Sequence, residues 1–132
     1  MNKLIIANWK MNPQTLEEAK KLLASLEYRL ANIEHTEVIL AVPFVYLPPL
    51  SLHAARTALA AQNLSWEDAG ALTGEISGSQ LRQWNIRYAI LGHSERRLFL
   101  GETDSMVNFK IQAAFRHKIT PILCLGGEEG AV

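Results

Sequence analysis

The chain has 132 residues, of which 48% are hydrophobic, and its thirteen basic and thirteen acidic side chains give a formal net charge of zero. A chain of this length can form one domain, residues 1–132, that buries roughly two-thirds of its unfolded surface. The balanced charge argues against a nucleic-acid partner. The N-terminal apolar run is too short for a membrane span or a signal peptide, and a single cysteine cannot form an internal disulfide. We therefore expect a cytoplasmic protein.

The first predicted strand, residues 4–7, precedes the best-defined helix in the sequence. Thr15 and Glu18 have the spacing of a capping box, with Thr15 as the N-cap. Apolar residues then recur on one helical face: Leu16, Ala19, Leu22, Leu23, Leu26 and Leu30. The aliphatic run 38–42 predicts the second strand.

Proline interrupts the segment that follows the second strand. Pro43 and the pair at 48–49 restrict any helix between residues 45 and 55 to a short or irregular one. The next predicted elements are a strand at 59–61, a short helix at 79–84 and a strand at 88–91.

The last predicted elements are a helix over 104–117 and a strand over 119–124. The residues of that helix expected to face inward are Val107, Ile111, Ala114 and Phe115. Five strands that are apolar on both faces, alternating with four helices, predict an α/β fold with a parallel sheet. This pattern fits both an arc of a (β/α) barrel and an open parallel sheet.

Polar residues follow the predicted strands. Asn8 and Lys10 follow the first strand, Gln62 and Asn63 follow the third, and His93 follows the fourth. Because sites in parallel α/β folds lie at the carboxyl ends of the strands, we expect these residues to share one site.

Six sequence blocks carry a resemblance to a known family. They are NWKMN at 8–12, AQN at 61–63, GALTGEIS at 70–77, LGHSERR at 91–97, GETD at 101–104 and PILC at 121–124. In this order they resemble triosephosphate isomerase over essentially all 132 residues. The resemblance favours the barrel arc and implies a partial TIM (β/α) barrel of five parallel strands with four helices, whereas a complete barrel has eight βα units in roughly 250 residues. A rearranged open parallel sheet is the alternative.

The resemblance also implies a chemistry. The family interconverts dihydroxyacetone phosphate and glyceraldehyde 3-phosphate in glycolysis and gluconeogenesis, through an enediolate and without a metal or organic cofactor. It implies that His93 and Lys10 stabilise the developing oxyanion, with His93 as a neutral imidazole at a helix N-terminus. Lys10 would also hold the phosphate, Asn8 would position the carbonyl, and Glu95 would orient Lys10.

The family's catalytic base is a glutamate after the sixth barrel strand, and its phosphate-gripping loops follow strands seven and eight. The 132 residues contain neither, so we expect this chain to be inactive on its own. The carboxylates considered as a substitute base are Glu75, Glu95, Glu102, Glu128 and Glu129. We expect Glu95 to pair with Lys10, Arg96 to pair with Glu102, and the others to be structural or exposed.

In the family, the counterpart of the segment 66–77 reaches into a partner subunit. The resemblance therefore implies that Thr73 and Met11 make dimer contacts. A five-stranded arc would have two unpaired edges, so we expect either a homo-oligomer or a complex with a complementary half-barrel chain. The alternative function is that of a non-catalytic truncated homologue or folding fragment that acts as a self-associating or interaction module.

Overall fold

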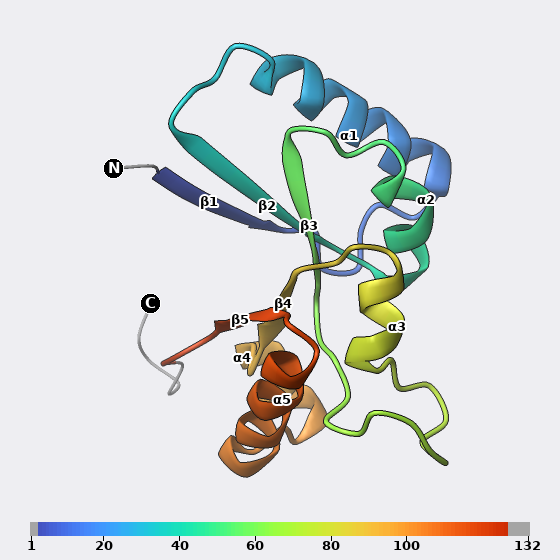
Figure 1. Ribbon diagram of the computed structural model, residues 1–132, viewed down its shortest axis with the longest axis vertical. Coiled ribbons are helices and arrows are strands. Elements are labelled where there is room, and N and C mark those ends of the chain that lie inside the picture. The colour runs from blue at the N-terminus through green and yellow to red at the C-terminus, as the bar shows by residue number, and fades with distance from the viewer. Residues whose placement is uncertain (1–2, 127–132) are drawn as a thin grey trace.

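The computed structural model describes residues 3–126 and contains one sheet of five parallel strands (Figure 1). The strands are β1 (Lys3–Asn8), β2 (Thr36–Val42), β3 (Thr57–Ala61), β4 (Tyr88–Leu91) and β5 (Thr120–Leu123). Their order in the sheet is their order in the chain. A doubly wound sheet reverses its strand order at a switch point. The sequential order found here is that of a curled half-barrel, so the α/β fold and the partial TIM barrel are confirmed.

The helices lie between successive strands. They are α1 (Leu16–Leu30), a 3₁₀ turn η1 (Phe44–Tyr46), α2 (Leu47–Ser51), α3 (Gly78–Gln83), α4 (Ser94–Leu100) and α5 (Asp104–Arg116). The prediction of four helices therefore missed α4. None of the residues of α4 is buried, so the helix has no apolar stripe that periodicity could reveal. Caps at both ends define it instead, with His93 at the N-terminus and Gly101 in the left-handed conformation at the C-terminus.

The core divides into two clusters, one on each face of the sheet. The larger cluster joins the helices to strand residues such as Leu40, Leu59 and Leu91. The smaller cluster consists of strand residues that face the inside of the half-barrel: Ile39, Ala41, Ala60 and Ile90. Burial on both faces explains why the central strands are continuous apolar runs. At the sheet edge, by contrast, Leu4, Ile5 and Ile6 of β1 are all exposed.

The predicted helix faces were wrong at three residues. Leu16 and Leu22 of α1 are exposed, while Ala19 and Leu23 are the residues that α1 buries. In α5, Phe115 is 64% exposed and Lys110 is buried in the core. The N-cap of α1 was correct, because Thr15 Oγ1 accepts a hydrogen bond from the Glu18 amide at 3.2 Å, although no reciprocal bond from the Glu18 carboxylate is present in the described part of the chain.

Lys110 lies at the centre of a buried polar network that links α5 to the ends of β3 and α4. Its Nζ donates to Asn63 Oδ1 at 2.9 Å and to Glu102 Oε1, and it lies 5.9 Å from the centre of the Trp66 ring. Arg96 Nε donates to the same Glu102 oxygen at 3.3 Å, which confirms the predicted ion pair. Within residues 3–126, Glu102 Oε2 has no hydrogen-bond partner. The network fixes the segment that follows β3 against α5.

The Glu102 carboxylate is expected to make the protein sensitive to acid. Burial acts to raise its pKa, but the hydrogen bond from Lys110 and the charges of Lys110 and Arg96 outweigh burial and hold the pKa below its ordinary value of 4.5. At a pH between the folded-state pKa and the unfolded-state pKa of Glu102, the unfolded chain therefore binds more protons than the folded chain. The stabilisation is complete above pH 4.5 and is lost as the pH falls through the folded-state pKa.

Urea unfolding followed by circular dichroism between about pH 6 and pH 3 measures this dependence. The Glu102→Gln variant is expected to lose less stability over that range than the unsubstituted chain. Some dependence remains in the variant, because hydrogen bonds from Thr57 and from the Arg56 and Thr57 amides also lower the pKa of Glu27 against the opposing effect of burial. Equal slopes in the two proteins would contradict the assignment to Glu102.

Candidate active site

The sheet brings together residues that are far apart in the chain at the carboxyl ends of its strands. β1 ends at Asn8, with Lys10 two residues further on, and β4 ends one residue before Gly92, which precedes His93. Lys10 Nζ donates to Glu95 Oε1 at 2.5 Å across 85 residues of sequence. The predicted pairing of Lys10 with Glu95 is therefore present, and it joins the turn after β1 to the start of α4.

The backbone at Lys10 is unusual for a residue with a side chain. Its φ is 56°, in the left-handed region that non-glycine residues seldom occupy. Two side chains hold this conformation: Asn8 Oδ1 accepts from the Lys10 amide at 2.9 Å, and Gln62 Nε2 donates to the Lys10 carbonyl at 2.8 Å. Gln62 also donates to the Ala41 carbonyl at 3.2 Å, which ties the turn to β2. Such strain persists where the surroundings fix it, and it is common at functional sites.

Lys10 and Glu95 are about half exposed, so both side chains are accessible to a ligand. The hydrogen bond from Lys10 is the main reason that the pKa of Glu95 lies below its ordinary value, and the nearby charge of Lys10 acts in the same direction. Glu95 therefore stays ionised near neutral pH. An ionised carboxylate bound to Lys10 orients the ammonium group and is a poor base.

His93 is the N-cap residue of α4. Its Nδ1 accepts a hydrogen bond from the Glu95 amide at 3.2 Å. The Glu95 carboxylate lies 3.6 Å from the same nitrogen, but it is bonded at closer range to Lys10. Because Nδ1 acts as an acceptor, the proton of the neutral ring is on Nε2. This tautomer presents an N–H donor that Glu95 does not use, which is what polarising a carbonyl requires.

The other candidate carboxylates divide clearly. Glu75 is exposed in the segment between β3 and α3, and Glu102 is bound in the buried network with Lys110. Glu128 and Glu129 lie outside the described residues. Among residues 3–126, no group of three or more His, Cys, Asp or Glu side chains is arranged to hold a metal ion.

Thr73 and Met11, the predicted dimer contacts, are both exposed. Thr73 belongs to the segment 62–77, which extends away from the sheet beyond α3 (Figure 1). The two ends of this segment are joined by a hydrogen bond from the Ser65 amide to the Ile76 carbonyl at 2.8 Å. Arg116 also holds the segment, because it donates to the Trp66 carbonyl at 2.8 Å. The role of these residues as dimer contacts stays a prediction.

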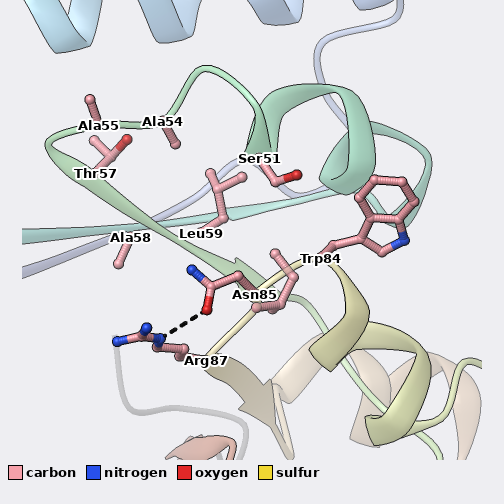
Figure 2. A pocket seen from close by; sticks show the side chains of 10 residues that line it. Ser51, Ala54, Ala55, Thr57, Ala58, Leu59, Trp84, Asn85 and Arg87 are labelled. Carbon is pink, nitrogen blue, oxygen red and sulfur yellow. Dashed lines mark hydrogen bonds between the residues drawn. The ribbon is translucent and has the colours of Figure 1, made fainter.

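A separate hollow of about 270 Å³ lies at the amino ends of β3 and β4 (Figure 2). β3 and β4 pair only at Ala60 with Tyr88 and Ala61 with Ala89, so β3 residues 57–59 are not paired with the segment that precedes β4, and space remains there. Arg87 and Asn85 bond to each other at its rim, at 3.2 Å. This end of the strands is opposite to the carboxyl ends that carry Lys10 and His93. The lack of pairing at the start of β3 explains the hollow without a ligand.

No helix among the described residues is both long and apolar enough to cross a membrane.

Comparison with known proteins supports the resemblance. The sequence profile of the family described as triosephosphate isomerase matches residues 3–131. A triosephosphate isomerase of Picosynechococcus sp. is 50% identical over 129 residues, which cover 96% of this chain and 54% of that relative. Those of Trichodesmium erythraeum and Acetivibrio thermocellus are 50% and 45% identical over 130 residues, covering 96% of this chain and 54% and 51% of the relatives. The chain spans about half the length of these curated relatives. It belongs to the triosephosphate isomerase family.

Proposed function

We propose that the chain supplies the electrophilic part of a triosephosphate isomerase site, which interconverts dihydroxyacetone phosphate and glyceraldehyde 3-phosphate. The observation that supports this most directly is the series of contacts from Lys10 to Glu95 and from the Glu95 amide to His93. It places an ammonium group and an imidazole N–H at the same end of the sheet. The substrates belong to glycolysis and gluconeogenesis, and we propose a cytoplasmic location.

Each residue has a role in this proposal. Removing a proton next to a carbonyl places negative charge on oxygen, and donors fixed in advance lower that barrier. His93 Nε2–H and Lys10 Nζ donate to the developing oxyanion, and Lys10 also attracts the phosphate. Asn8 Oδ1 accepts a hydrogen bond from the Lys10 amide, which fixes the Lys10 turn, and Asn8 positions the substrate carbonyl. Glu95 orients Lys10. The reaction requires no metal or organic cofactor.

The base is the part that these residues do not provide. Glu95 and Glu102, two of the candidate carboxylates, are bound to lysines. We propose that the base comes from a polypeptide equivalent to the part of the curated relatives that this chain does not match. The 132-residue chain is then inactive alone and becomes active in a complex with that complementary half-barrel.

Reconstitution tests this function. We expect no conversion of glyceraldehyde 3-phosphate above background by the 132-residue chain, and activity when the complementary half is added. In the complex, His93→Ala is expected to lower kcat/KM by about 10²- to 10⁴-fold, the usual contribution of one positioned proton donor.

The control for the assay is His35→Ala, because His35 is an exposed histidine in the turn before β2, and this change is expected to leave the rate unchanged. If His93→Ala retained the full rate of the complex, the assignment of His93 would be wrong. Activity of the chain alone that disappears in His93→Ala would show that self-assembly creates a complete site with another base.

The alternative function, a self-associating or interaction module, is supported by the exposed apolar edge of the sheet. Leu4, Ile5 and Ile6 of β1 are 56%, 52% and 40% exposed, and Leu123 of β5 at the other edge is 41% exposed. Edge strands of this kind pair readily with other chains. Under either function, we propose that the 132-residue chain forms a homo-oligomer when it lacks a complementary half-barrel.

Sedimentation velocity measures this association. The unsubstituted chain is expected to sediment as species larger than a monomer, in proportions that rise with concentration. Ile5→Lys places a charge on the β1 edge and is expected to shift the distribution toward the monomer. Tyr28→Lys is the matched control, because Tyr28 is exposed on α1 and does not belong to an edge strand. A monomer at all concentrations, or an equal shift in both variants, would contradict association through β1.

A further inference from the structure

The turn that carries His93 is covered by a side chain that the proposed function does not use. Gly92, between β4 and His93, has a φ of 71°, in the left-handed region that glycine adopts most readily. Arg97 Nε donates to the Gly92 carbonyl at 2.8 Å. A Cβ atom added to Gly92 would lie 2.9 Å from a guanidinium nitrogen of Arg97, and 3.1 Å and 3.2 Å from the methyl groups of Val107. The turn is therefore closely packed beneath Arg97.

Arg97 bonds the chain on both sides of His93. Its side chain holds the carbonyl of the residue before His93, and its own amide donates to the His93 carbonyl at 3.1 Å. The guanidinium is fixed in turn, because Nη1 donates to Asp104 Oδ1 at 2.5 Å and Asp104 is the first residue of α5. Through Arg97, the His93 turn is connected to a helix that is packed into the core.

The orientation of the His93 ring depends on this backbone. The hydrogen bond to the ring within residues 3–126 is the one that Nδ1 accepts from the Glu95 amide at 3.2 Å. That amide keeps its place only while residues 92–95 keep their conformation. The amides of Arg96 and Arg97 hold the His93 carbonyl, but the Gly92 carbonyl before it is held by the Arg97 side chain. We expect release of the Gly92 carbonyl to shift the turn enough to lengthen the bond from the Glu95 amide to Nδ1, which would allow the proton to occupy either ring nitrogen.

We propose that Arg97 is a positioning residue that fixes the orientation of His93 and its Nε2–H tautomer. The consequence for catalysis rests on the proposed function, because it assumes that His93 donates to the substrate. The consequence for the ring itself does not, because it concerns the conformation of this chain alone.

The experiment compares the imidazole nitrogens of His93 by long-range ¹H–¹⁵N correlation NMR in the 132-residue chain, at alkaline pH where imidazoles are neutral. His93→Ala identifies the resonances. We expect a clear acceptor shift for Nδ1 and a clear donor shift for Nε2 in the unsubstituted chain. In Arg97→Met, the two shifts are expected to move toward each other as both tautomers become populated.

Arg116→Met is the matched control. Arg116, the last residue of α5, has the same kind of contacts as Arg97, since it donates to the Trp66 carbonyl at 2.8 Å and to Asp68 Oδ1 at 3.1 Å. Arg116→Met therefore loses an equivalent set of bonds at the C-terminal end of α5, opposite to the end that holds Asp104. We expect the His93 resonances to be unchanged in this variant, and an equal change in both variants would overturn the proposal.

A second variant keeps the test decisive if Arg97→Met does not fold. Arg97→Lys retains the positive charge but lacks the planar fork that reaches Gly92 and Asp104 together. It is expected to change the His93 tautomer in the same direction, and an unchanged pattern in folded Arg97→Lys would overturn the proposal.

The reconstituted enzyme provides the catalytic readout. Arg97→Lys is expected to lower kcat by about 10- to 100-fold with little change in KM, because misplacing a catalytic group by about an ångström has an effect of this size. A change in KM alone would overturn the positioning role. If reconstitution yields no activity in any variant, the proposed function fails, while the NMR comparison still decides the role of Arg97.

Discussion

Replacing Lys110 with methionine is expected to lower the free energy of unfolding by about 3–5 kcal/mol, the usual cost of removing one partner from a buried ion pair. The side chains of Lys110 and Glu102 are 4% and 3% exposed. Without the ammonium group, Glu102 keeps Arg96 at 3.3 Å as its charged partner, and Asn63 Oδ1 loses the donor that satisfies it. The penalty comes from Asn63 Oδ1, which is left without that donor, and from Glu102, which loses the nearer of its two charged partners, because methionine fills a similar volume.

Denaturant unfolding of Lys110→Met and Lys21→Met measures this effect. Lys21 forms an exposed pair with Glu17 at 3.6 Å, so its replacement is expected to change the unfolding free energy by less than about 0.5 kcal/mol. The double variant Glu102→Gln/Lys110→Met removes both charges and is expected to recover part of the loss. Equal effects of the two lysine substitutions would show that the network contributes no more than a surface pair.

Replacing Lys10 with methionine is expected to lower kcat/KM of the reconstituted enzyme by about a thousandfold, the upper range for removing one donor to a developing oxyanion. The proposed Lys10 role includes both the phosphate and the oxyanion, so both KM and kcat are expected to change. The positive φ of Lys10 and its bonds to Asn8 and Gln62 hold this donor in place before substrate binds. Steady-state kinetics in both directions of the reaction measure the loss.

A second readout of Lys10→Met needs no activity. The pKa of the Glu95 carboxyl, followed by NMR, is expected to rise toward its ordinary value of 4.5 when the hydrogen bond from Lys10 is removed. Lys21→Met is the control for both measurements and is expected to change neither. An unchanged rate in Lys10→Met, together with a raised pKa of Glu95, would separate the ion pair from catalysis and reject the proposed role of Lys10.

The sequence by itself determined the elements whose patterns are local. The five apolar runs became the five strands, and Thr15 capped α1 as its spacing predicted. The positions of Lys10 and His93 after strands were enough to place them at one end of the sheet, because parallel strands have their carboxyl ends on the same side. The six sequence blocks identified the family, since a match of residue types in order needs no knowledge of contacts.

The tertiary structure decided which charged groups are buried and which partners they have. The inward face of α5 could be read from the sequence, because Val107, Lys110 and Ala114 are at helical spacing. A lysine at such a position is nevertheless expected to face solvent, and only the contacts with Asn63 and Glu102 show that Lys110 is buried. The sequence also missed α4, because this helix is defined by its caps and buries no apolar stripe. Periodicity reports the average hydrophobicity of a face, whereas the burial of a charge depends on partners contributed by other elements. Two further features depend on contacts between elements. They are the packing of Arg97 over Gly92 and the sequential strand order that makes the sheet a half-barrel, and only the folded chain forms them.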